Sequence, residues 1–271
     1  MARGTSDFAP GKKRCVTRPE NPFAAEGVGA LYAKGRPYHH PRALARALAM
    51  LGETHVRRGL DVACGTAMST RALREIADEV VGADRSPEML AAAPRGEGIA
   101  YVRSTAEELP FPAGSFDAIT VSSGVHWFDQ PRFFAEAHRL LAPGGWVTLY
   151  DHYFLGEMAD VPAFADWTRV AFDRYPLPDR SPQVGDPRSE IPEGFVKVGD
   201  EFYGDDIDMT QDEFVAYEMS LSPFVAAVDR GSRREEVAGW LRETTRDFFA
   251  GVAARTISFL GSVTCLRPVW P

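Results

Sequence analysis

A small-residue turn followed by an acidic residue is the first pattern in this chain that could bind a ligand. In "LDVACGTA", Gly65 lets the backbone approach a ligand without a Cβ in the way. Ala63 and Ala67 stand where a dinucleotide fingerprint would have glycines, so the turn alone fits nucleotide binding and plain tight packing equally. Asp84 ends the next apolar run, about 20 residues on, where a carboxylate can accept hydrogen bonds from both ribose hydroxyls. The alternative role of Asp84, a charge at a helix start, is weaker beside the turn.

The elements that must position these residues alternate along the first half of the chain. Their apolar runs and capping residues predict strands and helices in turn. The strands are expected at 59–63, 80–84, 99–105, 116–124 and 145–153, and the helices at 43–51, 69–79, 86–93 and 131–145. Continuous apolar strands that alternate with helices predict an α/β fold, with a parallel sheet covered on both faces.

The second half of the chain departs from this alternation. Strands are predicted at 195–204 and 256–270, and helices at 211–224 and 234–252. We expect these strands to complete the sheet and the helices to form a lid over the substrate. The predicted organisation is a flexible arm at 1–22, a Rossmann-like core with a lead-in helix at 23–155, and the late strands with the lid at 156–271.

Composition narrows the class of protein. The formal net charge of -8 over 271 residues argues against general affinity for nucleic acid, which requires a basic field. Cys15, Cys64 and Cys265 lie far apart, which predicts neither a disulfide framework nor a zinc or other metal site. The apolar runs are shorter than the roughly 18 residues of a membrane helix, and the start lacks a signal-peptide core. We therefore expect a cytoplasmic protein with no membrane partner.

Four segments in series carry a family resemblance. They are "LDVACGTAMST", "VVGADRSPEML", "YVRSTAEELPFPAGSFDAITVSSGVHWF" and "FFAEAHRLLAPGGWVTLY". Over residues 30–150 the chain resembles class I S-adenosylmethionine-dependent methyltransferases of the methyltransferase type 11 kind. The "HWF" segment and the upstream "YAKGRPYHHP" resemble the trans-aconitate methyltransferase-like branch, which methylates small molecules. The resemblance implies a Rossmann-like sheet with a C-terminal helical lid and S-adenosyl-L-methionine as cofactor.

The resemblance also implies roles for single residues. Asp84 should hold the ribose, Met89 should pack against adenine, and Arg36 should pair with the methionine carboxylate, although a solvated arginine is the alternative. Thr105 stands where the family has an acid that reads the adenine amino group, and threonine is a weaker acceptor. The full set of implied cofactor residues is Tyr32, Arg36, Asp61, Ala63, Gly65, Thr66, Asp84, Arg85, Met89, Thr105, Ala106, Glu107 and Ser122.

Two histidines are the candidates for acid–base chemistry at the acceptor. His126 follows the fourth predicted strand and His152 lies at the end of the fifth, and a neutral imidazole there could remove or share an acceptor's proton. A purely structural role is the alternative for each. The predicted acceptor-binding residues, for which core packing is the alternative, are Trp127, Tyr153, Tyr217, Met219 and Ser222.

The predicted reaction is methyl transfer to a small-molecule acceptor, on a carboxylate or hydroxyl oxygen. Transfer to nitrogen or carbon, and a methyltransferase-like protein that binds the cofactor without transferring methyl, are the alternatives. The sequence leaves the oligomeric state open.

Overall fold

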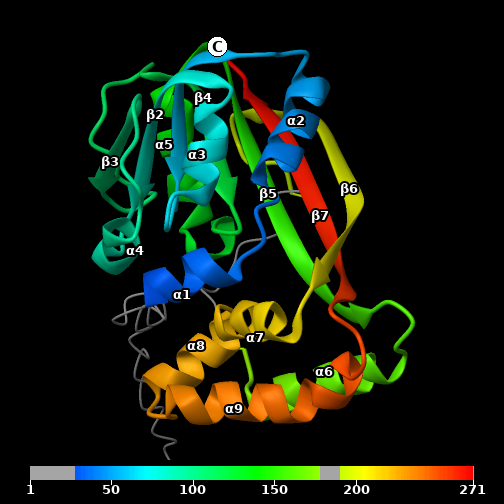
Figure 1. Ribbon diagram of the computed structural model, residues 1–271. Helices are drawn as coiled ribbons and strands as arrows, with labels where there is room; N and C mark the ends of the chain where they lie inside the picture. The colour runs from blue at the N-terminus through cyan, green and yellow to red at the C-terminus, as the bar shows by residue number, and fades with distance from the viewer. Residues whose placement is uncertain (1–27, 178–189, 271) are drawn as a thin grey trace, which may run out of the picture.

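A seven-stranded sheet forms the centre of the molecule (Figure 1). The computed structural model describes residues 28–177 and 190–270, and the predicted arm at 1–22 lies outside them. The strands lie in the order β3-β2-β1-β4-β5-β7-β6. Five of them are parallel, and β7 runs antiparallel to both of its neighbours. Their bounds are β1 Val56–Val62, β2 Ala77–Asp84, β3 Ile99–Arg103, β4 Phe116–Ser122, β5 Leu141–Met158, β6 Phe195–Met209 and β7 Arg255–Pro268.

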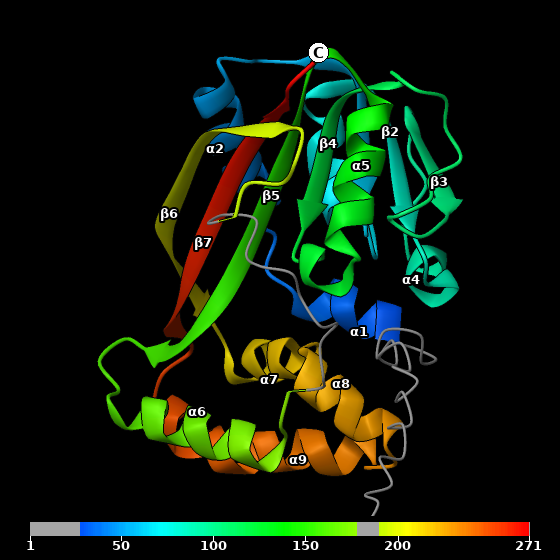
Figure 2. The ribbon, with the colours of Figure 1, turned by 180° about the vertical axis from the view of Figure 1, so that it is seen from behind.

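Helices cover both faces of the sheet, as the alternation predicted. On one face, α2 (His40–Leu51) and α3 (Met68–Arg74) bury small and branched side chains against β1, β2 and the β5–β7 strands. On the other face, α5 (Gln130–Leu140) inserts Phe133 and Phe134 among residues of β1, β4 and β5. Figure 2 shows α5 on its side of the sheet. The apolar faces of these helices are thereby removed from water, which is the main favourable term in folding.

Two predicted helices are too long, because strand pairing overrides helix propensity at their ends. The helix predicted at 69–79 stops at Arg74, and Ala77 already pairs with Val56 of β1. The helix predicted at 131–145 stops at Leu140, and Leu141 pairs with Phe116 of β4. The register between β4 and β5 shifts just after this pair, which accommodates the Pro-Gly-Gly segment.

A layer of helices lies beyond the carboxyl ends of the parallel strands (Figure 1). Its members are α6 (Ala163–Arg174), α7 (Gln211–Met219), α8 (Ser222–Asp229) and α9 (Arg234–Thr245). The single helix predicted at 211–224 is two helices, because Leu221 is extended and Pro223 opens α8. At the start of α7, the Thr210 hydroxyl accepts from the Glu213 N–H, and the Glu213 carboxylate accepts from the Thr210 N–H.

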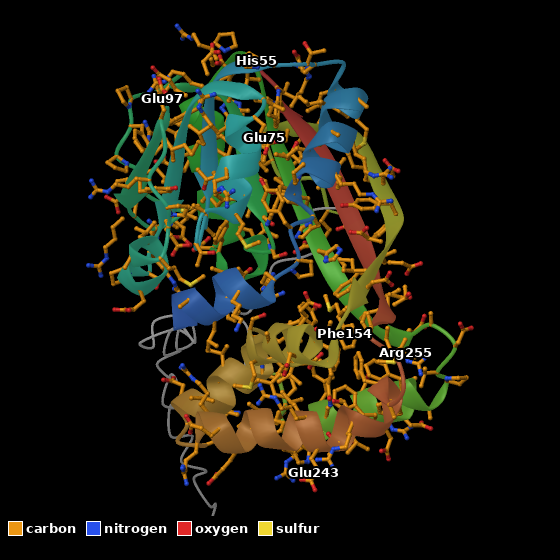
Figure 3. The ribbon with its side chains drawn as sticks, viewed as in Figure 1. His55, Glu75, Glu97, Phe154, Glu243 and Arg255 are labelled. Atoms are coloured by element: carbon orange, nitrogen blue, oxygen red, sulfur yellow. The ribbon has the colours of Figure 1, made fainter. Side chains whose placement is uncertain are left out.

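The sheet and the helical layer are joined through long strands. β5 stays paired with β7 as far as Met158, so the boundary predicted at 155/156 falls inside a strand. At this junction Phe154 of β5 points toward the helices (Figure 3). Its ring centroid lies 6.0 Å from that of Phe214 and 5.8 Å from that of Tyr217 on α7. Because these aromatic contacts cross the junction, α7, which belongs to the predicted lid helices, packs onto the sheet.

The lead-in helix α1 (Val28–Gly35) lies between the core and the helical layer (Figure 1). Its two glycines mark close contacts. A Cβ at Gly29 would come within 2.8 Å of the Glu88 carbonyl oxygen on α4 (Pro87–Ala91), and one at Gly35 would overlap the Ala216 carbonyl on α7. The absence of a side chain at these positions lets α1 pack directly against both helices.

Candidate functional site

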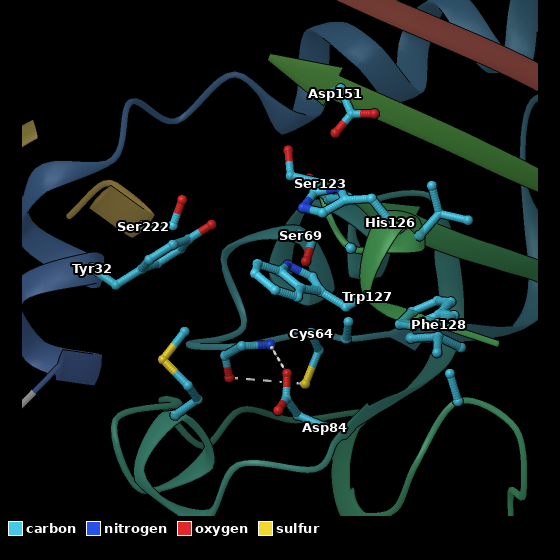
Figure 4. Close-up of a pocket in the computed structure, with 18 of the residues that line it drawn as sticks. Tyr32, Cys64, Ser69, Asp84, Ser123, His126, Trp127, Phe128, Asp151 and Ser222 are labelled. Carbon is cyan, nitrogen blue, oxygen red and sulfur yellow. Dashed lines mark hydrogen bonds between the residues drawn. The ribbon is translucent and has the colours of Figure 1, made fainter. Parts of the chain in front are cut away.

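A cavity of about 520 Å³ opens where the parallel strands end. Its walls come from the ends of β1, β2 and β4 and the residues after them, from the middle of β5, from α1, and from the α7–α8 region. Figure 4 shows Tyr32 and Ser222 on one side of this space and Asp84, Trp127, His126 and Asp151 on the other. Ligands of open α/β sheets bind at this edge, outside the carboxyl ends of the strands.

A buried acid, Asp61, lies beneath the turn after β1 and is hydrogen-bonded to its surroundings. Asp61 accepts hydrogen bonds from Ser69 Oγ at 2.6 Å and Thr70 Oγ1 at 2.7 Å, and from Thr120 Oγ1 of β4 at 3.2 Å. Burial raises the pKa of Asp61 to about 6, against the lowering effect of these hydroxyls. Asp61 is fully buried and does not line the cavity, so the structure places it behind the turn, and its contact with the cofactor stays a prediction. Asp61 ties the start of α3 to β1 and β4.

The turn itself adopts a backbone conformation that brings it close to the cavity. Ala63, Gly65 and Ala67 all have positive φ angles of 54° to 65°. Alanine adopts this conformation at a cost of about 1 kcal/mol or more, which the surrounding hydrogen bonds must offset. Ala63, Gly65 and Thr66, which are predicted cofactor residues, line the cavity.

Asp84 lies at the end of β2 and faces the turn. Its Oδ2 accepts from the Gly65 N–H at 2.8 Å (Figure 4). Its Oδ1 accepts from the Ser86 N–H at 2.8 Å. Burial raises the pKa of this carboxyl, and the two backbone N–H groups act in the opposite direction. Each carboxylate oxygen has a second lone pair, so the group can accept two more hydrogen bonds from a ligand in the cavity.

The residues predicted at the adenine end lie together beside Asp84. Ser86 caps α4 by accepting from the Met89 N–H, and the Met89 side chain faces the cavity. Arg85, Thr105, Ala106 and Glu107 also line this end. The Glu107 carboxylate accepts from the Asp129 N–H at 3.0 Å, so it also fixes the segment that begins α5.

The α1 side of the cavity presents an aromatic surface and a cation. The Arg36 guanidinium lies 4.8 Å from the ring centroid of Tyr32 and 5.6 Å from that of Tyr217, and it donates to the Ser220 carbonyl at 3.3 Å. Both tyrosines and Arg36 line the cavity. A guanidinium held between two rings is positioned for a carboxylate and still retains unused donors.

One predicted acceptor residue points away from the cavity. Trp127, Tyr153, Tyr217 and Ser222 line it, whereas Met219 packs in the aromatic core of the helical layer. Tyr217 and Met219 are two positions apart on α7, so their side chains leave the helix on opposite sides. The sequence analysis missed several apolar residues that also line this end, namely Phe154, Phe172, Leu177, Leu221 and Pro223.

Between Tyr217 and Met219, α7 carries a fully buried acid. Glu218 has no solvent exposure, and neither of its carboxylate oxygens has a hydrogen-bond partner among residues 28–177 and 190–270. Burial raises the pKa of Glu218 to about 8, and the nearby Arg36 charge opposes this effect only in part. Glu218 is therefore mainly a neutral acid at pH 7.

Three histidines gather behind the ends of β4 and β5. His40 Nδ1 lies 3.1 Å from the Tyr150 hydroxyl and 3.5 Å from Ser122 Oγ. The His152 ring stacks on that of His39 with centroids 4.2 Å apart, and His152 Nε2 lies 3.0 Å from Asp205 Oδ2. His40, His152 and the predicted residues Ser122 and His126 line the cavity.

Burial keeps this histidine cluster neutral. It lowers the pKa of His40 to about 3 and that of His39 well below its ordinary range, and the neighbouring histidines and Arg36 act in the same direction. Burial also lowers the pKa of His152, although Asp205 opposes the shift. The sequence analysis did not assign His39, His40 or Asp205 to the site. Asp205 belongs to β6, far along the chain, and no local pattern connects it to His152.

The site can now be compared with known proteins. The family model described as "Methyltransferase domain" matches residues 60–149. Residues 60–149 are a methyltransferase domain. The match confirms the predicted methyltransferase class, for which S-adenosyl-L-methionine is the implied cofactor, and it leaves the trans-aconitate methyltransferase-like branch a prediction. The matched residues run from β1 to β5 and contain the turn, Asp84 and the "HWF" segment.

Similar proteins share this domain. An uncharacterized methyltransferase of Mycobacterium tuberculosis is 37% identical over 135 residues, which are 48% of this chain and 52% of the relative. The demethylmenaquinone methyltransferase of Thermus thermophilus is 42% identical over 108 residues, 37% of this chain and 49% of that protein. The chain thus spans about half the length of these two relatives.

A solved structure confirms the fold over most of the chain. A protein of Anaeromyxobacter dehalogenans, provisionally assigned as a type II methyltransferase, superposes with a TM-score of 0.62. The two sequences are 24% identical, and the match covers 86% of this chain and 97% of the other. The α/β fold with the added helices is therefore common to both. In the described part of this chain, no helix is long and apolar enough to cross a membrane.

Proposed function

We propose that this protein transfers a methyl group from S-adenosyl-L-methionine to an oxygen of a small molecule. The observation that carries the proposal is one continuous cavity with two chemically different ends. One end presents the Asp84 carboxylate beside the Gly65 backbone, and the other presents His126 and His152 among aromatic side chains. The methyl donor and the methyl acceptor can then bind next to each other in one cavity.

The residues at the first end fit the cofactor. Asp84 has acceptor capacity for two ribose hydroxyls, Met89 offers an apolar surface for the adenine ring, and Arg36 offers a cation for the methionine carboxylate. When bound, the cofactor supplies a methyl group on a positively charged sulfur. The protein has to hold an acceptor in line with that group and keep water away from it.

The second end fits a small acceptor with an apolar body. Trp127, Tyr153 and Tyr217 form its walls, and Ser222 adds a hydroxyl where α8 begins. His126 and His152 are the groups that can take a proton or orient an oxygen. The Thermus thermophilus relative is named for demethylmenaquinone, a small molecule, which supports a small acceptor here.

Cofactor binding tests the first half of the proposal. Titration calorimetry with S-adenosyl-L-methionine should show binding to the wild type and a loss of about 10- to 100-fold in Asp84→Asn, because charge-assisted hydrogen bonds contribute about 1.5–3 kcal/mol. Asp166→Asn on the outer side of α6 is the matched control and should bind as the wild type does. Equal affinity in Asp84→Asn would refute the role of Asp84.

Product analysis tests the second half. Small acceptors are incubated with the protein and a cofactor labelled in its methyl group, and the products are separated by mass spectrometry. Transfer to oxygen predicts S-adenosylhomocysteine together with a labelled ether or ester. Label recovered on nitrogen or carbon would contradict oxygen transfer, and cofactor binding without any S-adenosylhomocysteine would contradict methyl transfer itself.

A further inference from the structure

His152 is held by a carboxylate at one ring nitrogen, and among residues 28–177 and 190–270 its other ring nitrogen has no hydrogen-bond partner. Its Nε2 lies 3.0 Å from Asp205 Oδ2, and Asp205 also pairs with Arg42 of α2 through Oδ1. An ionised carboxylate only accepts hydrogen bonds, so Nε2 must carry the proton and donate it. In the neutral ring, Nδ1 then carries the lone pair.

The free nitrogen is accessible from the cavity. His152 lines the cavity, and its Nδ1 has no hydrogen-bond partner in the described part of the chain. The Nδ1 atom of His39 is buried and has no hydrogen-bond partner. The Nδ1 atom of His152 is not one of these buried, unpartnered atoms. The His152 ring is fixed between His39, at 4.2 Å, and Phe259, at 4.6 Å, in two nearly parallel stacks. Asp205 and the two stacked rings leave little freedom for the imidazole to turn.

The surroundings of this nitrogen favour a neutral acceptor. Asp151, the residue before His152, lines the same end, so the side chains next to His152 add no cation for an acceptor carboxylate. The cations among the described lining residues are Arg36 and Arg85, and Arg85 follows β2 at the other end. Arg36 retains unused donors beside its two tyrosine rings and the Ser220 carbonyl, and the proposed function assigns these donors to the methionine carboxylate of the cofactor. The remaining walls are largely aromatic or aliphatic.

We propose that Asp205 is the positioning residue that fixes His152 with its proton on Nε2, so that Nδ1 removes the proton of a neutral hydroxyl on an apolar or aromatic acceptor. This inference rests on the proposed function and narrows its acceptor from oxygen in general to hydroxyl. The acceptor's O–H proton passes to Nδ1 and its oxygen takes the methyl group. The electron pair of the broken carbon–sulfur bond stays on sulfur, which leaves S-adenosylhomocysteine and a methyl ether. The imidazolium, stabilised by Asp205, returns its proton to solvent.

Asp205→Asn tests the positioning role through the tautomer of His152. Arg42 donates to Oδ1, so the asparagine oxygen should stay on Arg42 and its NH₂ group should face Nε2. The proton of the ring would then move to Nδ1 and the base would be lost. The double variant Arg42→Ala/Asp205→Asn frees the amide to turn, and the Nε2–H form should return. Arg42→Ala alone should keep the wild-type tautomer.

Nitrogen NMR of protein labelled in histidine reads the tautomer directly, with His152→Gln assigning the signal. We expect Nε2–H in the wild type and in the double variant, and Nδ1–H in Asp205→Asn. Cofactor affinity by calorimetry should stay within about 2-fold, while turnover should fall by roughly 100-fold or more, the usual contribution of a general base. An unchanged tautomer in Asp205→Asn, or a loss of turnover that the double variant does not restore, would overturn the positioning role.

Paired probes test the acceptor class. Phenol with benzoate, and 2-naphthol with 2-naphthoate, share a ring and differ in the oxygen group. We expect methyl ethers from the hydroxyl probes and little or no ester from the carboxylates. A wild type that methylates the carboxylates but no hydroxyl probe would overturn this inference and leave oxygen transfer standing. A wild type that binds the cofactor and forms no S-adenosylhomocysteine with any probe would overturn the proposed function as well.

Discussion

Replacing the buried acid of α7 should stabilise the protein in a way that depends on pH. Glu218 is fully buried and unpartnered in the described structure, and its pKa is raised to about 8 from an ordinary 4.5. Between these two values the unfolded chain has lost the proton that the folded chain still holds. Wild-type stability therefore falls as pH rises from 4.5 to 8. Glu218→Gln has the same shape as the neutral acid and no proton to lose.

The size of the effect follows from the pKa. Each pH unit between 4.5 and 8 should widen the gap between the variant and the wild type by about 1.4 kcal/mol. At pH 7, which lies 2.5 units above 4.5, Glu218→Gln should be more stable by about 3 kcal/mol. Near pH 4.5 and below, the two proteins should be nearly equal, and above pH 8 the gap should stop growing.

Urea unfolding followed by tryptophan fluorescence at pH 5.5, 6.5 and 7.5 measures these free energies. The diagnostic quantity is the slope of the stability gap against pH. Glu243→Gln, an exposed glutamate on α9 (Figure 3), is the control and should give a gap that does not change with pH. A constant gap for Glu218→Gln would show that Glu218 is ionised and satisfied in the folded protein, which would refute the reasoning.

Two further predictions concern the acceptor end. Tyr217→Ala should raise the acceptor KM more than the cofactor Kd, because its ring lines the cavity, whereas Met219→Ala should mainly lower stability by about 2–5 kcal/mol as a core truncation. The acceptor KM is measured for both variants, together with their urea unfolding curves. Similar KM values in the two variants would show that the acceptor does not bind against Tyr217. His126→Ala should cost less turnover than His152→Ala, because Asp205 orients only His152. The reverse order, in rates measured with the same hydroxyl probe, would assign the base to His126.

The parts of the fold that the sequence predicts well are those with local causes. The Ser86–Pro87 start of α4 is readable from its capping residue, and the alternation of apolar strands with helices predicts the core of the sheet. Helix ends are less readable, because Ala77 to Glu79 suit a helix and become strand only through pairing with β1. The split between α7 and α8 has a local cause, which is Pro223. The apolar pattern continues across this proline, so the pattern alone predicts one helix.

The residues of the site also divide into those with a local signal in the sequence and those placed together only by the fold. Asp84 and Gly65 lie in short motifs whose contact follows from the parallel strands they end. The His152–Asp205 pair depends on β6 and β5 both lying beside β7, an arrangement with no local signal. The surroundings of Asp61 are hidden from the sequence for a related reason. An acid just before a ligand-binding turn suggests a ligand contact, and only the structure shows three hydroxyl groups closing over it.

The two glycines of α1 have a consequence for both ends of the cavity. Gly29 presses the helix against α4, which caps the adenine end, and Gly35 presses it against α7, which lines the acceptor end. Because α1 approaches both helices at glycines, a shift of α1 toward either of them would be blocked by the backbone. A movement of α1 would therefore alter its contacts with α4 and with α7 together, and so affect the two ends of the cavity at once.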